Sequence, residues 1–187
     1  MTTMKITFFT SMLALTTAGF LIGCEPDKAP TAPPPPQPTA AEVSSALPDD
    51  LFLDKAPEGA VELAAAKKSA KPGDQVVVRG RIAGQVDPLA PNRAILTLLD
   101  GAVTTCDEMP GDSCATPWDA CCEPRESLQA NTATIQVVDA AGKPLKTGLR
   151  GVNGIEPLKE LVVVGQVHDA SDANALVIDA KGIYVKG

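Results

Sequence analysis

The stretch KPGDQVVVRGRIAG, residues 71–84, predicts a long β-strand that bends. Its aliphatic residues alternate with arginines: Val76, Val78 and Ile82 on one face, Arg79 and Arg81 on the other. This period of two is typical of a strand with one buried face, so we expect both arginines to lie on a solvated edge. Gly80 and Gly84 have no Cβ atom and would let the strand bend sharply.

Four further aliphatic runs predict strands, which makes five in all. Each run is rich in aliphatic or β-branched residues and is bounded by Gly, Pro, Asp or Asn. They lie at residues 94–100, 132–139, 161–169 and 175–186. In the last run the alternation fails between Ile178 and Ile183, so we expect a β-bulge there, at Gly182. An alanine-rich segment, 58–70, precedes the first strand and predicts a short helix.

Five strands, a glycine-bearing first strand and a longer connection between the third and fourth strands resemble the OB-fold. The resemblance implies a mainly β, small five-stranded barrel, here with a short N-terminal helix and a cysteine-rich insertion between strands 2 and 3. The connection, residues 148–158, often carries a helix in that family. Its three glycines and one proline predict a short helix or none. A different small barrel or a β-sandwich is the alternative.

Composition argues against nucleic-acid binding, although OB-folds often bind single strands. Such binding needs a basic groove and aromatic platforms. The chain has 23 acidic and 16 basic residues, a net charge of −7. Beyond residue 23 its only aromatic residues are Phe52, Trp118 and Tyr184. We therefore expect no nucleic-acid partner.

The N-terminus predicts export followed by lipidation. Lys5 precedes an apolar run without charge, residues 6–23, which is the pattern of a signal peptide. The sequence LIGC, ending at Cys24, resembles the bacterial lipobox. That resemblance implies cleavage before Cys24, a diacylglycerol on its sulfur and an acyl chain such as palmitate on its new amino group. The alternative is a free or buried cysteine in an uncleaved anchor.

We therefore expect three regions: a signal peptide (1–23), a lipidated cysteine with a proline-rich stalk (24–56) and a barrel domain (57–187). Two or three acyl chains anchor a protein stably, so the expected location is the cell envelope, on the inner or outer membrane, facing the periplasm or exterior. Eight prolines between residues 25 and 48 favour an extended stalk. A proline-rich ligand for a partner's aromatic groove is the alternative.

Four of the five cysteines lie in the insertion predicted at residues 101–131: Cys106, Cys114, Cys121 and Cys122. Thiols pair in oxidising compartments, and four cysteines permit two bridges. The adjacent Cys121 and Cys122 could bridge each other only with strain, because their Cα atoms are too close. We expect Cys106 and Cys114 each to pair with one of them, in either combination.

A metal site is the sharper alternative for the same residues. Thiolates bind zinc and copper(I), so Cys106, Cys114, Cys121 and Cys122 could act as ligands, joined by the only histidine, His168. Thiol redox chemistry is a third reading. The paired CxxC knuckles of zinc sites are missing from the sequence, so we expect structural disulfides with no metal or other cofactor.

The sequence contains no catalytic constellation that we recognise: no HExxH motif, no phosphate-binding glycine loop and no triad beyond His168 with an unplaced serine. We expect a non-enzymatic module in which the disulfide-ordered insertion binds a protein or an envelope polymer. The membrane, reached through the lipid anchor, is the other expected partner.

Overall fold

The computed structural model describes residues 46–187. The predicted signal peptide, the lipidation site at Cys24 and most of the predicted stalk lie outside the described residues. Within residues 46–187, no helix is both long and apolar enough to cross a membrane.

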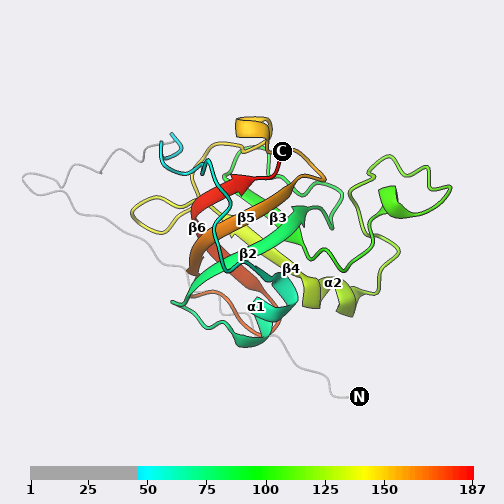
Figure 1. Cartoon of the computed structure of the whole chain (residues 1–187), viewed down its shortest axis with the longest axis horizontal. Coiled ribbons are helices and arrows are strands. Elements are labelled where there is room, and N and C mark those ends of the chain that lie inside the picture. Colours follow the sequence, from blue (N-terminus) through cyan, green and yellow to red (C-terminus); the bar gives the residue numbers. More distant parts are fainter. Residues whose placement is uncertain (1–45) are drawn as a thin grey trace, which may run out of the picture. The chain divides into compact units, whose positions relative to one another are not determined.

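A closed β-barrel forms the centre of the described domain (Figure 1). Its five strands are β2 (Gln75–Ile82), β3 (Ile95–Leu99), β4 (Thr132–Gln136), β5 (Glu160–Val167) and β6 (Leu176–Val185). They are joined in the order β2-β3-β4-β6-β5, and β5 closes the barrel by pairing with β2. All neighbours are antiparallel except β4 and β6. The predicted mainly β, OB-like barrel is thus confirmed.

The first barrel strand, β2, is shared between several partners. One edge pairs with β5 from Gln75 to Arg81, and the other pairs first with β1 (Val61–Glu62) and then with β3. Gly80 lies at this exchange, where a Cβ atom would be 2.9 Å from the carbonyl oxygen of Leu99. Absence of a side chain here lets β3 approach β2 closely, a role of Gly80 that differs from the sharp bend that the sequence predicted.

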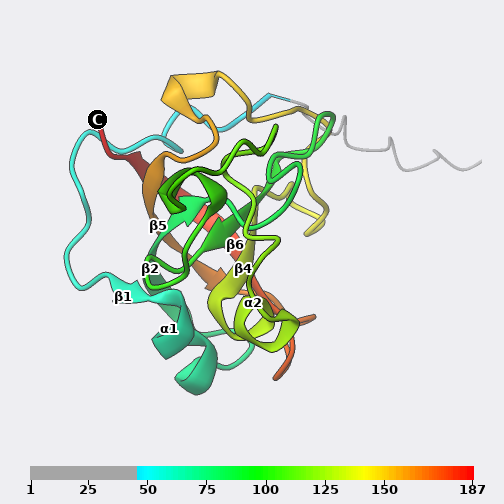
Figure 2. The same cartoon turned by 90° about the vertical axis from the view of Figure 1, so that its right-hand side faces the viewer.

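Helices are short in the described range. The α1 helix (Leu63–Ser69) falls within the predicted 58–70 segment, but residues 61–62 of that segment form β1 instead. The α2 helix (Arg125–Asn131) ends the insertion and was not predicted. Figure 2 shows α1 and α2 side by side at one end of the barrel. The connection between β4 and β5 contains only a 3₁₀ turn, Val152–Gly154, as its glycines predicted.

The folded domain extends further toward the N-terminus than the expected boundary at residue 57. Leu51 is buried in the barrel core, and Phe52 forms a bridge with Ile183 of β6. The backbone of Ile183 donates to the Leu51 carbonyl at 2.7 Å and accepts from Leu53 N–H at 2.9 Å. The segment therefore covers an edge of β6, and residues 51–53, which were expected to lie outside the barrel domain, belong to it.

An extra residue in β6 resolves its broken alternation. Val164 of β5 lies opposite Gly182, and the next residue, Gly165, lies opposite Ala180. Lys181 is the extra residue and is exposed. Ala180 and Ile183 on either side of the bulge are both buried in the core, whereas Gly182 lies against Leu53. The predicted bulge is confirmed one position before Gly182.

Replacing Gly165 with alanine should destabilise the barrel. A Cβ atom at Gly165 would lie 2.5 Å from the carbonyl oxygen of Asp179 and 2.6 Å from Cγ2 of Ile178, so β5 and β6 would have to separate. We expect a loss of about 2–3 kcal/mol in the free energy of unfolding by urea. Gly101→Ala is the matched control, because no atom lies within 4 Å of its Cβ position. Equal stability of the two variants would contradict this packing.

Candidate functional site: the cysteine cluster

The insertion between β3 and β4 is held to the barrel by Arg81. Its Nη2 donates to Thr105 Oγ1 at 2.8 Å and to Glu108 Oε2 at 2.8 Å. The Arg81 side chain is only 17% exposed, whereas that of Arg79 is 56% exposed and pairs with Glu62. The expectation of a solvated edge is therefore wrong for Arg81, because the insertion folds back over this end of β2.

A capping box shapes the part of the insertion that Arg81 contacts. The 3₁₀ turn Cys106–Glu108 begins after Thr105, whose backbone N–H donates to Glu108 Oε2 at 2.9 Å. The bond from Arg81, followed by the bond from Thr105 N–H, holds the pKa of Glu108 below its usual value. The sequence TCDE has the S/T-x-x-E signature of such a box, so this signal was available in the sequence and was missed.

The two limbs of the insertion are tied together through their backbones. Cys106 N–H donates to the Asp119 carbonyl at 2.8 Å, and Asp107 N–H donates to the Pro117 carbonyl at 2.9 Å. The Trp118 indole N–H donates to the Val86 carbonyl at 3.0 Å. A small apolar cluster lies beneath this segment: Ala83, Leu99, Val103 and Ala120, with Trp118 and Leu128 packed against it. These contacts fix the backbone of Cys106 against that of Pro117 and Asp119, which precede Cys121.

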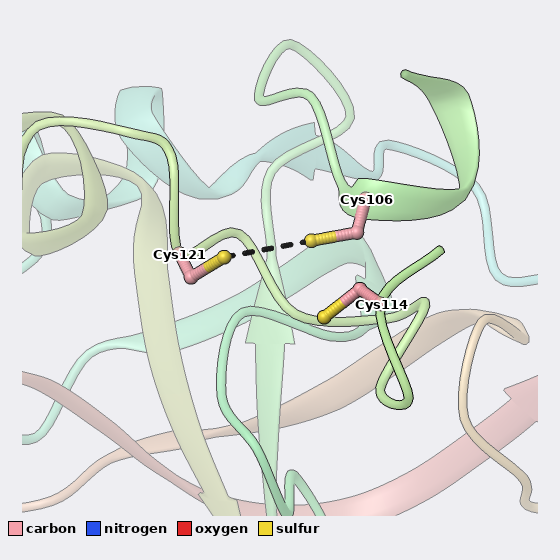
Figure 3. A group of neighbouring side chains, drawn as sticks. All are labelled: Cys106, Cys114 and Cys121. Atoms are coloured by element: carbon pink, nitrogen blue, oxygen red, sulfur yellow. Dashed lines mark hydrogen bonds between the residues drawn. The ribbon is translucent and has the colours of Figure 1, made fainter. Parts of the chain in front are cut away.

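Three sulfur atoms converge where the limbs meet (Figure 3). The Sγ atoms of Cys106, Cys114 and Cys121 all lie within 4.8 Å of one another, and the distance from Cys106 to Cys121 is 3.7 Å. Cys122 is adjacent, with its Sγ atom 4.0 Å from that of Cys121. The structure thus brings the predicted cysteines together, three of them in one triangle.

The thiols differ in environment and acidity. Cys106 is 2% exposed, and burial raises the pKa of its thiol to about 12. Cys114 is half-buried. The hydroxyl of Thr116, with Oγ1 3.5 Å from its sulfur, lowers the pKa of Cys114. A hydrogen bond with Cys121 raises the pKa of Cys122. We infer that Cys114 forms a thiolate more readily than Cys106 or Cys122.

His168 does not belong to this cluster. His168 follows the last residue of β5. The first residue of that strand, Glu160, is at the opposite end and pairs with Arg81 beside the insertion. The Nδ1 atom of His168 accepts a hydrogen bond of 3.0 Å from Ala170 N–H and so closes a local turn. Among residues 46–187, the group with metal-ligating geometry consists of cysteines alone. His168 is therefore not a ligand of the metal site that was considered as the alternative to disulfides.

A groove lies beside the insertion on the outer face of β2, β5 and β6. It has a volume of about 560 Å³. Charged side chains line it, namely Arg79, Arg81, Glu108, Glu160 and Lys186, and so does the aromatic ring of Tyr184. Glu160 pairs with Lys186, so the groove carries charges of both signs. This surface can offer polar and aromatic contacts to a ligand or partner.

No protein-family model, curated protein or solved structure matches this chain. The chemistry of the site therefore has to be inferred from its geometry. Converging thiols can do two things: pairs of them can be oxidised to disulfides, or together they can bind a soft cation.

Cys114 should remain open to alkylation at lower pH than Cys106 and Cys122 do. A lowered pKa keeps the thiolate, which is the nucleophile, populated at more acidic pH. We expect iodoacetamide labelling of the reduced protein, followed site by site by mass spectrometry, to give a lower pH midpoint for Cys114 than for Cys106 or Cys122. Thr116→Val should raise that midpoint, whereas Thr104→Val, at an exposed threonine of the same insertion, should not. A midpoint for Cys114 above those of Cys106 and Cys122 would refute the assignment.

Proposed function

We propose that this chain is a lipid-anchored protein of the cell envelope whose OB-like barrel is a non-enzymatic interaction module. The uncharged apolar run, the LIGC sequence at Cys24 and the proline-rich segment support the anchor and the stalk. The observation that carries the proposal is the insertion itself, because Arg81 and the backbone bonds to Asp119 and Pro117 fix a long loop on the barrel surface. A fixed insertion beside a groove is suited to recognition, since little ordering is required on binding.

In the exported protein, disulfides add to the contacts that hold the insertion on the barrel. The 3.7 Å distance favours a bridge between Cys106 and Cys121, which leaves Cys114 to pair with Cys122. For each bridge, two thiols form one S–S bond, and their two protons and two electrons pass to a disulfide of the oxidant, which becomes two thiols. The sulfurs must approach to about 2.05 Å, a shift within the reach of a loop. Each bridge would stabilise the fold by about 2–4 kcal/mol.

The groove and the adjoining face of the insertion form the proposed contact surface for a protein or an envelope polymer. Glu108 and Arg81 belong to both the groove wall and the anchor of the insertion. The shape of the groove therefore depends on how the insertion is held on the barrel. His168, the only histidine of the chain, closes a turn, which supports binding over general acid–base catalysis as the role of the domain.

Metal binding or thiol redox chemistry is the second candidate function. The specific observation in its favour is the convergence of three Sγ atoms within 4.8 Å. The same cysteines would then have a chemical role besides ordering the insertion.

Exported protein should carry acyl chains on Cys24 and two disulfides in the insertion. We expect the full chain, expressed in a bacterium with its own N-terminus, to fractionate with membranes and to incorporate labelled palmitate. Cys24→Ser should abolish both properties, whereas Cys121→Ser should leave them intact and remove one bridge. Peptide mapping without reductant should give Cys106–Cys121 and Cys114–Cys122, and a mass lower by about four hydrogens than that of the reduced protein. Four titratable thiols in freshly isolated protein would contradict the two disulfides.

A further inference from the structure

We propose that the reduced insertion is a three-thiolate site for copper(I), formed by Cys106, Cys114 and Cys121, with Cys122 outside the ligand set. The inference concerns the same cysteine cluster as the proposed function and rests on it for the place of the site. It adds a ligand, a coordination number and a residue that does not take part.

The sulfur triangle has nearly the size that a metal requires. With metal–sulfur bonds of about 2.3 Å, as in zinc thiolates, three sulfurs around a planar ion lie about 4.0 Å apart. The Cys106–Cys121 distance is 3.7 Å, and the other two distances of the triangle are within 4.8 Å. Closing the triangle on a cation therefore needs side-chain shifts of less than about 1 Å, which χ1 rotations within a loop can supply.

The number and type of donors favour copper(I) over zinc. Thiolates are soft ligands that select copper(I) or zinc, but closed zinc sites take four ligands in a tetrahedron. Cys122 lies 4.0 Å from Cys121 and yet falls outside the group whose members all lie within 4.8 Å of one another. The nearby carboxylate of Asp107 is engaged by Thr105 and lies 3.9 Å from Arg81. Among residues 46–187, no fourth donor atom joins the three sulfurs within 4.8 Å of one another, which suits a three-coordinate cation.

The surroundings of the triangle allow entry and retention of the ion. Cys121 is exposed, Cys114 is half-buried and Cys106 is buried, so a cation can meet the outer thiols first and then displace the proton of Cys106. Cys106 and Cys121 are both close to backbone that is fixed by the bond from Cys106 N–H to the Asp119 carbonyl. Binding to three thiols releases three protons, so the apparent affinity should rise with pH.

Metal loading and disulfide formation exclude each other at this site. A Cys106–Cys121 bridge consumes two of the three donors, and the remaining thiol or bridge cannot replace them. The oxidised protein should therefore bind no copper(I) in the insertion. The state of the cysteines on export decides which of the two forms is present.

Competition with a chromogenic copper(I) chelator, bathocuproine disulfonate, tests the proposal on the full chain, reduced and kept free of oxygen. We expect one equivalent of copper(I) per chain. Cys106→Ser, Cys114→Ser and Cys121→Ser should each weaken binding by more than about 100-fold, beyond the usual effect of losing a residue that only orients a ligand. Cys122→Ser, the matched control, should leave the affinity unchanged. X-ray absorption of the copper-loaded protein should show three Cu–S bonds and no shorter Cu–O or Cu–N bond.

Three results would overturn the proposal: less than one equivalent bound to the reduced wild-type chain, an equal loss of affinity in Cys122→Ser, or equal binding by the protein with two mapped bridges. Circular dichroism of each serine variant identifies any that does not fold, and X-ray absorption of the wild-type protein then decides the ligand set. Failure here leaves palmitate labelling and bridge mapping unaffected, so it is distinguishable from failure of the proposed function.

Discussion

Arg81 is the contact on which the order of the insertion depends. A segment of the length of residues 101–131 does not usually order itself, and its regular structure here is limited to one 3₁₀ turn and α2. Arg81 supplies charge-assisted bonds from β2, a strand paired on both edges, to Thr105 and Glu108. Such bonds are about twice as strong as neutral ones. The barrel thereby provides a rigid support that the insertion lacks.

The positions of the sulfur atoms follow from this anchor. Thr105 directly precedes Cys106, so fixing Thr105 also fixes the buried member of the cluster. The bond from Cys106 N–H to the Asp119 carbonyl then brings the second limb, with Cys121, to the same place. The contacts from Arg81 to Thr105 and from Cys106 to Asp119 therefore set the distances between thiols that can pair or bind a soft cation. Either chemistry would tighten an arrangement that the backbone already sets.

The barrel could be predicted from sequence because its signals are local, but the anchor depends on tertiary structure. The strands carry β-branched runs, and the failed alternation between Ile178 and Ile183 indicated the bulge. Arg81 and Glu108 are 27 positions apart, and periodicity assigns Arg81 only to a face, without saying what covers it. The α2 helix was missed because its seven residues contain no buried side chain. The short spacing of the cysteines in the sequence indicated that they would cluster. The distance of His168 from them could not be predicted in the same way, because it depends on the direction in which β5 runs.

Amide hydrogen exchange of the reduced protein, comparing Arg81→Gln with Arg79→Gln, tests the central role of this anchor most directly. Working without disulfides isolates the contribution of Arg81, and Arg79 is the neighbouring exposed arginine of the same strand. The anchor predicts exchange at least about tenfold faster at Cys106 and Asp107 in Arg81→Gln, equivalent to about 1.4 kcal/mol of local stability. Protection of β4 to β6 should be unchanged, as should that of the whole domain in Arg79→Gln. Wild-type protection of Cys106 and Asp107 in Arg81→Gln would contradict the account.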